Sequence, residues 1–303
     1  MTDNPFAAGA AYVDGRYMPV GQASIPLTDW GYRRSDAIYD VVSVWDGQFF
    51  RLDDHIARFR ASMRKLHFAP SESDEEIKAI VNRCVALSGL RNAYVAMDCL
   101  RGRPAPDKPY HPAYARNYVA AFAIPFVWVM NPEVQARGGH LIIAETLRIP
   151  RSSVDPTAKN FHWADLTRGQ FEALERGADF ALLLDSDGNL TEGAGFNVFV
   201  ATDGLLATPD SGVLEGVTRQ SVLDICEELG IPCQVRKISA AETREADEIF
   251  LTTTAGGVMP ASRIDGRIMN NDRPGPLSTR IKERFWAKRA EGWHATPVDY
   301  TAA

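Results

Sequence analysis

The sequence predicts a two-domain protein of mixed helices and strands. The chain has 303 residues, enough for one large domain or two of ordinary size. Its N-terminal part joins short apolar runs through Asp-Gly turns, which is typical of antiparallel hairpins, and then shows amphipathic helices. Its C-terminal half alternates apolar runs with helical patterns. These observations favour an α+β first domain and a second domain of α/β character.

Two hairpins open the predicted first domain. In each, an apolar run reaches an Asp-Gly pair, a strong two-residue turn signal, and a second run follows. The predicted strands are residues 11–13 and 16–18 around Asp14-Gly15, and residues 41–45 and 48–50 around Asp46-Gly47.

Two amphipathic helices follow the hairpins. The apolar residues of the first recur at steps of three and four, which places them on one helical face. They are Leu52, Ile56, Phe59, Met63 and Leu66. Asp53 and Asp54 stand at its start, where the helix dipole favours acids. A second helix is predicted over residues 73–88, ending before Gly89.

A long loop and a domain boundary come next. Strands are predicted over residues 93–100 and 118–126, and the proline-rich stretch 101–118 between them is predicted to be a functional loop. Turn signals at Asn131-Pro132 and Gly138-Gly139 mark the boundary. The predicted division is a small domain over residues 1–127, a linker over 128–137 and a large domain over 138–303.

The predicted large domain alternates strands and helices. The strands are expected over residues 140–145, 180–184, 197–201 and 248–251. The helices are expected over residues 162–176, 218–229 and 276–288.

Composition excludes several classes of protein. The 33 basic and 39 acidic residues give a net charge of −6, and no Lys/Arg-rich run is present, so neither nucleic acid nor an anionic membrane is an expected partner. No apolar stretch approaches the ~18–20 residues of a membrane span, and no secretory signal is visible. The four cysteines form no CxxC pair, and the six histidines show no metal-binding spacing. We expect a reduced, cytoplasmic protein without a metal.

Three segments have chemistry suited to an anion. Gly216-Val217-Thr218-Arg219 begins a predicted helix, where unpaired backbone N–H groups and the helix dipole favour a phosphate. Residues 252–257 combine threonine hydroxyls with small residues that let backbone amides approach closely. Arg58 could add a guanidinium. Each also has a purely structural interpretation: Thr218 as an N-cap, the threonine run as a turn, Arg58 as a surface residue.

Two further residues could carry chemistry. Lys159 is flanked by apolar and aromatic residues, and a lysine in such a site can act as an imine-forming amine or a proton shuttle. Glu192 lies among small residues that would let it approach a flat ligand closely. A solvated lysine and a turn glutamate are the structural alternatives.

Together these segments resemble one family, the class IV aminotransferases, which are fold type IV pyridoxal-phosphate enzymes. The resemblance covers about residues 12–286 and is carried by residues 52–58 (LDDHIAR), 159–160 (KN), 190–197 (LTEGAGFN), 214–219 (LEGVTR) and 252–257 (TTTAGG). It implies a D-amino-acid-aminotransferase-like fold, with a small α/β domain, a larger pseudo-barrel domain and pyridoxal 5′-phosphate between them.

The resemblance also implies roles for single residues. Lys159 matches the lysine that joins the cofactor covalently and moves the substrate proton. Glu192 matches the carboxylate that faces the ring nitrogen. The phosphate-binding residues it implies are Arg58, Val217, Thr218 and Thr254.

The subclass is predicted from residues 35–47 and 159–166, which look most like the (R)-selective amine transaminases. The substrate pocket would then include Tyr39, Arg34, Trp163 and Ala255. This chain departs from the amine group in having Ala96 and Arg34, which shift the pocket toward anionic substrates. Arginines that could bind a carboxylate are Arg34, Arg101, Arg103 and Arg116.

The expected function is therefore transfer of an amino group from a primary amine or amino acid to a 2-keto acid such as pyruvate. Branched-chain or D-amino-acid aminotransferase activity is the main alternative. Aminodeoxychorismate lyase activity and a non-catalytic binding protein on the same scaffold fit less well. The resemblance also implies a homodimer in which the loop over residues 101–118 closes the partner's site.

Overall fold

The computed structural model describes residues 4–302, which divide into two compact units. Unit 1 comprises the described residues up to Val127, the segment Ala158–Phe161 and the residues from Gly292 on. Unit 2 comprises Trp128–Thr157 and His162–Glu291. The four residues Ala158–Phe161 thus pack with unit 1, although their neighbours in the chain on both sides belong to unit 2.

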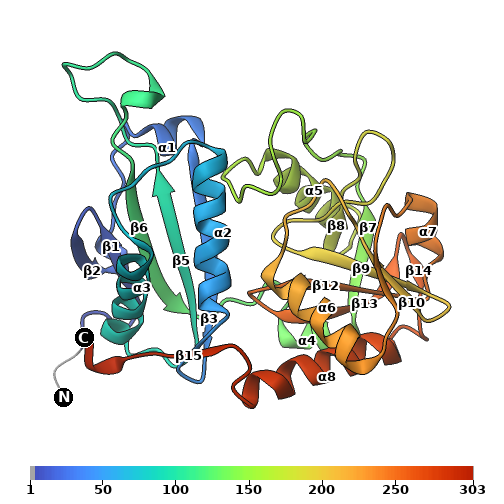
Figure 1. Ribbon diagram of the computed structural model, residues 1–303. Helices are drawn as coiled ribbons and strands as arrows, with labels where there is room; N and C mark the ends of the chain where they lie inside the picture. Colours follow the sequence, from blue (N-terminus) through green and yellow to red (C-terminus); the bar gives the residue numbers. More distant parts are fainter. Residues whose placement is uncertain (1–3, 303) are drawn as a thin grey trace. The chain divides into compact units, whose positions relative to one another are not determined.

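Unit 1 is built on an antiparallel sheet (Figure 1). Over residues 4–302 the sheet has seven strands in the order β15-β4-β3-β5-β6-β1-β2. The strands are β1 (Ala10–Val13), β2 (Arg16–Pro19), β3 (Ala37–Trp45), β4 (Gln48–Phe50), β5 (Ala93–Leu100), β6 (Tyr118–Pro125) and β15 (Ala295–Pro297). The helices are α1 (Trp30–Arg34), α2 (Leu52–Lys65) and α3 (Asp74–Ser88), with short 3₁₀ turns at Val20–Gln22, Pro112–Tyr114 and Tyr300–Ala302.

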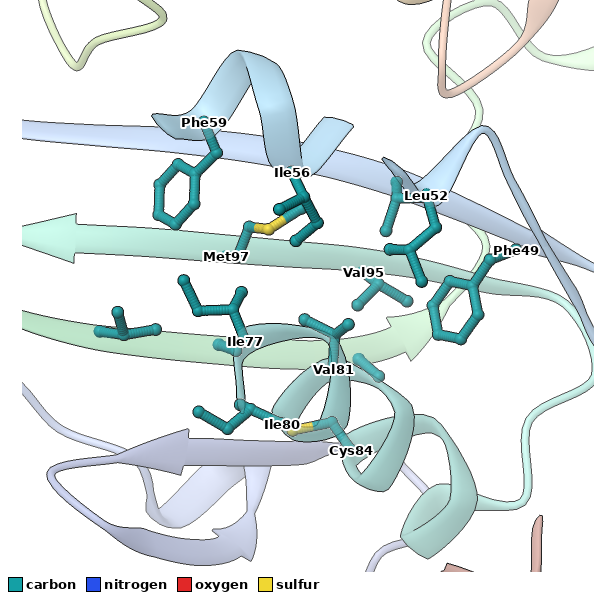
Figure 2. Close-up of a cluster of buried hydrophobic side chains, with 14 of the residues drawn as sticks. Phe49, Leu52, Ile56, Phe59, Ile77, Ile80, Val81, Cys84, Val95 and Met97 are labelled. Atoms are coloured by element: carbon teal, nitrogen blue, oxygen red, sulfur yellow. The ribbon is translucent and has the colours of Figure 1, made fainter. Parts of the chain in front are cut away.

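Helices α2 and α3 pack on one face of this sheet. Figure 2 shows side chains of both helices, such as Ile56 and Ile77, directed toward Val95 and Met97 of β5. Ser73 and Glu76 form a capping box that begins α3, and Gly89 ends it in the left-handed conformation. Burial of these apolar faces, rather than helix propensity, accounts for most of the stability of such helices.

Unit 2 is built on a mixed sheet whose main path runs β11-β10-β9-β12-β13-β7-β8, with β14 paired to β13. Its strands are β7 (Gly139–Ile143), β8 (Phe180–Leu182), β9 (Asn197–Thr202), β10 (Leu205–Thr208), β11 (Cys233–Val235), β12 (Glu248–Thr253), β13 (Gly257–Ile264) and β14 (Arg267–Ile268). Its helices are α4 (Pro132–Arg137), α5 (Ala164–Glu175), α6 (Val217–Leu229), α7 (Ala240–Glu245) and α8 (Pro276–Ala290). Strands β13 and β7 are parallel, as are β7 and β8, whereas β9, β12 and β13 pair antiparallel.

Most predicted elements are present. Both hairpins form, with Asp14-Gly15 and Asp46-Gly47 at positive φ as a two-residue turn requires. Three expectations need correction. The large domain predicted over residues 138–303 includes Lys159 and the residues from Gly292 on, whereas these belong to unit 1. The stretch 128–137 contains helix α4 of unit 2, since Asn131 caps it and Pro132 occupies its first turn. The N-cap of α6 is Gly216, and Thr218 lies inside the helix.

Two expected absences can be compared with the structure. Within residues 4–302, no group of three or more His, Cys, Asp or Glu side chains could hold a metal ion. None of the helices described there is both long enough and apolar enough to cross a bilayer.

Candidate active site

Lys159 is fixed to unit 1 through its backbone. Its N–H donates to Oγ of Ser62 on α2 at 3.0 Å, and its carbonyl accepts from the N–H of Tyr39 on β3 at 3.0 Å. Asn160 forms a β-bridge with Ile38. The Nζ of Lys159 lies 4.3 Å from the centroid of the Tyr39 ring. An amine on the negative face of an aromatic ring is a cation–π arrangement, so the lysine side chain is held by Tyr39 as well as by its backbone.

Arg58, on the same helix as Ser62, is paired with a buried carboxylate. Its Nε and Nη2 donate to the two oxygens of Asp40, each at 2.8 Å. Nδ1 of His55 donates to Asp40 at 2.7 Å. The Asp40 side chain is fully buried, and that of Arg58 is 11% exposed. A bidentate pair of this kind fixes the plane and direction of the guanidinium.

The charges of this cluster follow from its contacts. Burial by itself would raise the pKa of Asp40, but Arg58 and His55 together hold it well below its usual range. Burial lowers the pKa of His55, which outweighs the opposite effect of Asp40. Asp40 is therefore ionised and His55 neutral at pH 7, and the cluster consists of one cation, one anion and a neutral imidazole.

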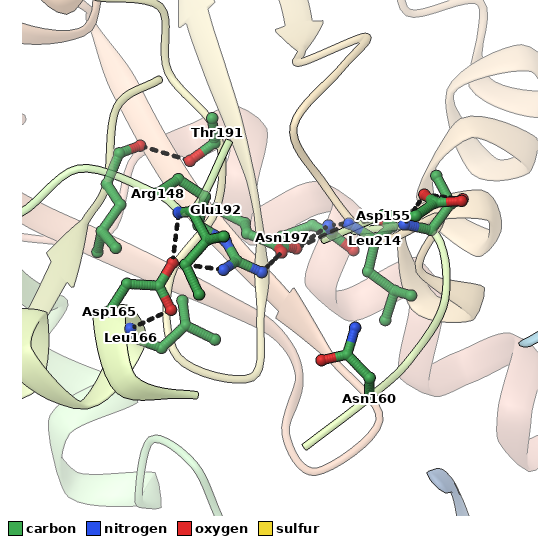
Figure 3. A network of polar contacts seen from close by, with 12 residues as sticks. Arg148, Asp155, Asn160, Asp165, Leu166, Thr191, Glu192, Asn197 and Leu214 are labelled. Carbon is green, nitrogen blue, oxygen red and sulfur yellow. Dashed lines mark hydrogen bonds and ion pairs between the residues drawn. The ribbon is translucent and has the colours of Figure 1, made fainter. Parts of the chain in front are cut away.

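Glu192 belongs to a second buried network, in unit 2 (Figure 3). Its Oε1 accepts from Nη2 of Arg148 at 2.9 Å, and Oε2 accepts from the N–H of Leu214 at 2.9 Å. Nη1 of Arg148 donates to Asp165 at 2.6 Å. Asn197 donates to the carbonyl of Leu214 at 2.8 Å and lies 3.4 Å from Oε2 of Glu192. The carboxylate is thus held on both oxygens.

The start of α6 has the features of an anion site. Gly216 is its N-cap, no side chain caps the helix, and no acid lies in its first turn. Val217 and Thr218 are buried there, as is the guanidinium of Arg219, which donates to Thr208 and to the carbonyl of Pro209. Unsatisfied N–H groups, the helix dipole and a buried cation all favour an anion at this position.

The threonine run at the end of β12 provides hydroxyls. The Oγ1 of Thr252 is buried and has no hydrogen-bond partner among the described residues. Thr253 donates to the carbonyl of Gly195 at 2.8 Å and so connects this run to the loop that carries Glu192. Thr254 is partly buried and Ala255 is buried.

Comparisons with known proteins agree on one family. The model of the family described as amino-transferase class IV matches residues 37–264. The chain belongs to the class IV aminotransferases. A putative branched-chain-amino-acid aminotransferase of Methanocaldococcus jannaschii is 29% identical over 277 residues, covering 90% of this chain and 94% of the relative. A D-alanine aminotransferase of Bacillus licheniformis is 30% identical over 272 residues, covering 89% and 93%.

Solved structures agree with this assignment. The branched-chain aminotransferase of Thermoproteus uzoniensis, crystallised with norvaline, superposes with a TM-score of 0.87 at 27% identity and covers 96% of this chain and 99% of its own. The branched-chain amino acid aminotransferase of Thermobaculum terrenum, in its PLP form, superposes with a TM-score of 0.84 at 25% identity and covers 96% and 98%. The predicted fold of a two-domain fold type IV enzyme is thereby confirmed.

The residues of this aminotransferase fit the family's cofactor, pyridoxal phosphate. In unit 1 the guanidinium of Arg58 is a group of the kind that binds a phosphate, and in unit 2 the open start of α6 and the unpartnered hydroxyl of Thr252 are such groups too. Unit 2 also has the buried carboxylate of Glu192, which suits a protonated ring nitrogen, and unit 1 has the amine of Lys159, which suits an aldehyde carbon. The family match, together with this donor set, supports the predicted cofactor.

The predicted pocket residues lie in both units. Phe161 packs edge-on against Tyr39 in unit 1. In unit 2, Trp163 packs against the apolar cluster that includes Leu183, and a Cβ at Gly195, in the loop of Glu192, would lie 3.5 Å from its ring. Arg34 is stacked 3.8 Å from the Trp30 ring centroid, with its Nη2 3.4 Å from the hydroxyl of Tyr110.

The other candidate arginines differ in how free they are to bind a carboxylate. Arg101 is buried and donates to both oxygens of Asp36 and to the carbonyls of Leu66 and His67, so it has a structural role. Exposed Arg116 pairs with Asp14, and Arg103 is exposed.

Sequence reasoning missed Asp40, Arg148, Asp165 and Asn197. One signal was available for Asp40: it interrupts an apolar strand, and a carboxylate that faces a core needs a cationic partner. The helix that follows offers Arg58. No comparable local signal connects Arg148 to Glu192, which is 44 residues away.

Proposed function

We propose that this enzyme is a pyridoxal-phosphate-dependent transaminase that takes an amino group from a primary amine with (R) configuration and passes it to a 2-keto acid such as pyruvate. The observation that carries the proposal is the fixed position of Lys159 beside Tyr39, with Ser62 and Arg58 on the helix that holds it. When bound, the cofactor withdraws electrons from the substrate carbon that loses its proton.

The residues of this chain would perform four tasks in that reaction. The Nζ of Lys159 would move the proton from the substrate Cα to C4′ of the cofactor in the first half-reaction, and from C4′ to Cα of the new amino acid in the second. Arg58, Val217, Thr218 and Thr254 would hold the phosphate, and Glu192 would favour the protonated ring nitrogen. Tyr39 would keep Lys159 near the reacting carbon, and Trp163 and Ala255 would shape the pocket for the amine.

The preference for amines is supported by the state of the arginines. Arg101 is fully used by Asp36 and two carbonyls, and Arg34 is stacked on Trp30. The second candidate, a branched-chain or D-amino-acid aminotransferase, is favoured by the relatives, whose names are those of branched-chain and D-alanine enzymes.

Single half-reactions test the proposal. We expect (R)-1-phenylethylamine to bleach the visible absorbance band of the cofactor-loaded enzyme faster than D-alanine or L-leucine does. Rapid bleaching by L-leucine or D-alanine without bleaching by the amine would replace the first candidate by the second. Lys159→Ala should lower the rate with every donor by at least about a hundredfold, whereas Lys237→Ala, at an exposed lysine, should not.

We further propose a cytoplasmic homodimer in which residues 101–118 close the partner's site. The exposure of Tyr110 (70%) and Tyr114 (52%) supports a docking role for this loop. Light scattering on the purified protein, combined with Tyr110→Ser, tests it: a monomer, or a variant with unchanged mass and unchanged activity, would contradict the proposal.

A further inference from the structure

The network around Glu192 contains a second carboxylate that the proposed reaction leaves without a role. Asp165, in the first turn of α5, accepts from Arg148 at 2.6 Å and from the N–H groups of Ile149 at 2.8 Å and Leu166 at 2.9 Å. Its side chain is 6% exposed, and those of Glu192 and Arg148 are 7% and 12% exposed. These three charges are therefore largely shielded from water, and each has a strong effect on the others.

Arg148 uses its two terminal nitrogens separately. Nη1 donates to Asp165 and Nη2 to Glu192, so one guanidinium bridges two carboxylates (Figure 3). Its Nε is buried and has no partner among the described residues. Although burial opposes its charge, the two carboxylates raise the pKa of Arg148. The bridge remains charged, and its planar geometry fixes Glu192 relative to α5.

The balance of charge distinguishes this network from a simple ion pair. The three bridged groups, two carboxylates and one guanidinium, together carry a charge of −1, and the buried guanidinium of Arg219 acts on Glu192 from outside this group. With Arg148 alone, the charge of Glu192 would be neutralised, and its attraction for a second cation would be weak. Asp165 offsets the charge of Arg148, so Glu192 can be held by a cation and still act as an anion.

We propose that Arg148 and Asp165 are positioning residues for Glu192: Arg148 orients its carboxylate, and Asp165 restores the negative charge that favours a protonated ring nitrogen in the cofactor. The proposal rests on the proposed role of Glu192 opposite that nitrogen. Neither residue touches the cofactor in this scheme, and both act through Glu192.

Binding of two cofactor analogues to the protein stripped of cofactor tests this role. Pyridoxamine phosphate has the ring nitrogen, and its 1-deaza analogue has a carbon in its place, so the ratio of their Kd values reports the ring-nitrogen interaction alone. Asp165→Asn should reduce the preference for the nitrogen form by about tenfold, equivalent to about one pKa unit of that nitrogen. Arg148→Lys keeps the positive charge but cannot bridge the two carboxylates, so it should reduce the preference for the nitrogen form less than Asp165→Asn does. Asp187→Asn, in an exposed turn of the same unit, should leave it unchanged.

The possible outcomes separate the two proposals. A purely structural role would weaken binding of both analogues equally, and an unchanged ratio in Asp165→Asn and Arg148→Lys would overturn the inference. If Glu192→Gln also leaves the ratio unchanged, the proposed role of Glu192 fails instead. Because only a ratio within one variant is compared, partial loss of stability does not obscure the result.

Discussion

Each unit buries an arginine–carboxylate cluster, and the two clusters divide their charges in opposite ways. In unit 1, the carboxylate of Asp40 is shared by Arg58 and a neutral His55. In unit 2, the guanidinium of Arg148 is shared by Asp165 and Glu192. The first cluster is neutral and presents a cation toward its candidate ligand group, while the second is anionic and presents an anion.

This difference matches the cofactor's own charges. A guanidinium of fixed orientation suits a phosphate, and the single buried carboxylate of Asp40 fixes the orientation of Arg58. A protonated ring nitrogen needs a net negative charge, which one arginine between two carboxylates preserves. In both units, a residue to which the resemblance assigns no role is paired with a residue to which it assigns one: Asp40 with Arg58, and Arg148 with Glu192.

The largest expected effect comes from breaking the unit 1 cluster. Asp40→Asn leaves Arg58 buried without its counter-charge and places an amide N–H₂ against it, so we expect the free energy of unfolding to fall by about 3–5 kcal/mol. Asp165→Asn should lower the free energy of unfolding less, because Arg148 keeps its ion pair with Glu192. Urea denaturation of the two variants measures both. Asp46→Asn, at an 85% exposed turn residue, is the control and should change stability by less than about 0.5 kcal/mol. Equal losses in Asp40→Asn and Asp165→Asn would show that the two clusters are equivalent.

A smaller effect is expected where the unit 2 network meets the start of α6. A Cβ at Gly216 would overlap Oδ1 of Asn197, whose amide contacts Glu192 and the carbonyl of Leu214. Gly216→Ala should therefore weaken the binding of pyridoxamine phosphate by about tenfold, or about 1.4 kcal/mol. The control is Gly21→Ala, where a Cβ meets nothing within 4 Å. Unchanged affinity in Gly216→Ala would argue against the start of α6 as the phosphate site.

The sequence predicted those parts of the candidate site that have local signals. Gly216 and Thr218 stand at a helix start, and Lys159 lies in a motif, so each could be identified from its neighbours. The hairpin turns were predictable for the same reason, since Asp-Gly adopts positive φ readily. Helix α4 was missed because six residues with few apolar positions give little periodicity, although Asn131-Pro132 is an N-cap signal.

The positioning residues could not be predicted, because they depend on the tertiary fold. Asp165 and Arg148 are 17 residues apart, on either side of a segment that leaves unit 2 at Ala158 and re-enters it after Phe161. Only the folded chain shows that one guanidinium reaches both Asp165 and Glu192. Pairings of this kind depend on distances between elements, which periodicity and motifs do not contain.

The last prediction concerns Asp98, a carboxylate whose pKa is shifted by burial and not by a counter-charge. Asp98 on β5 pairs in register with Tyr39 on β3, and burial raises its pKa to about 7. The unfolded chain has a pKa of about 3.9 for this group. Between about pH 4 and pH 7 the folded state therefore binds more protons than the unfolded state, and stability falls as the pH rises. Asp98→Asn should remove this slope, which is at most about 1.4 kcal/mol per pH unit. Urea midpoints at several pH values, with Asp46→Asn as control, measure it. If the slope persists in Asp98→Asn, a group other than Asp98 takes up the proton between pH 4 and pH 7, and the prediction is wrong.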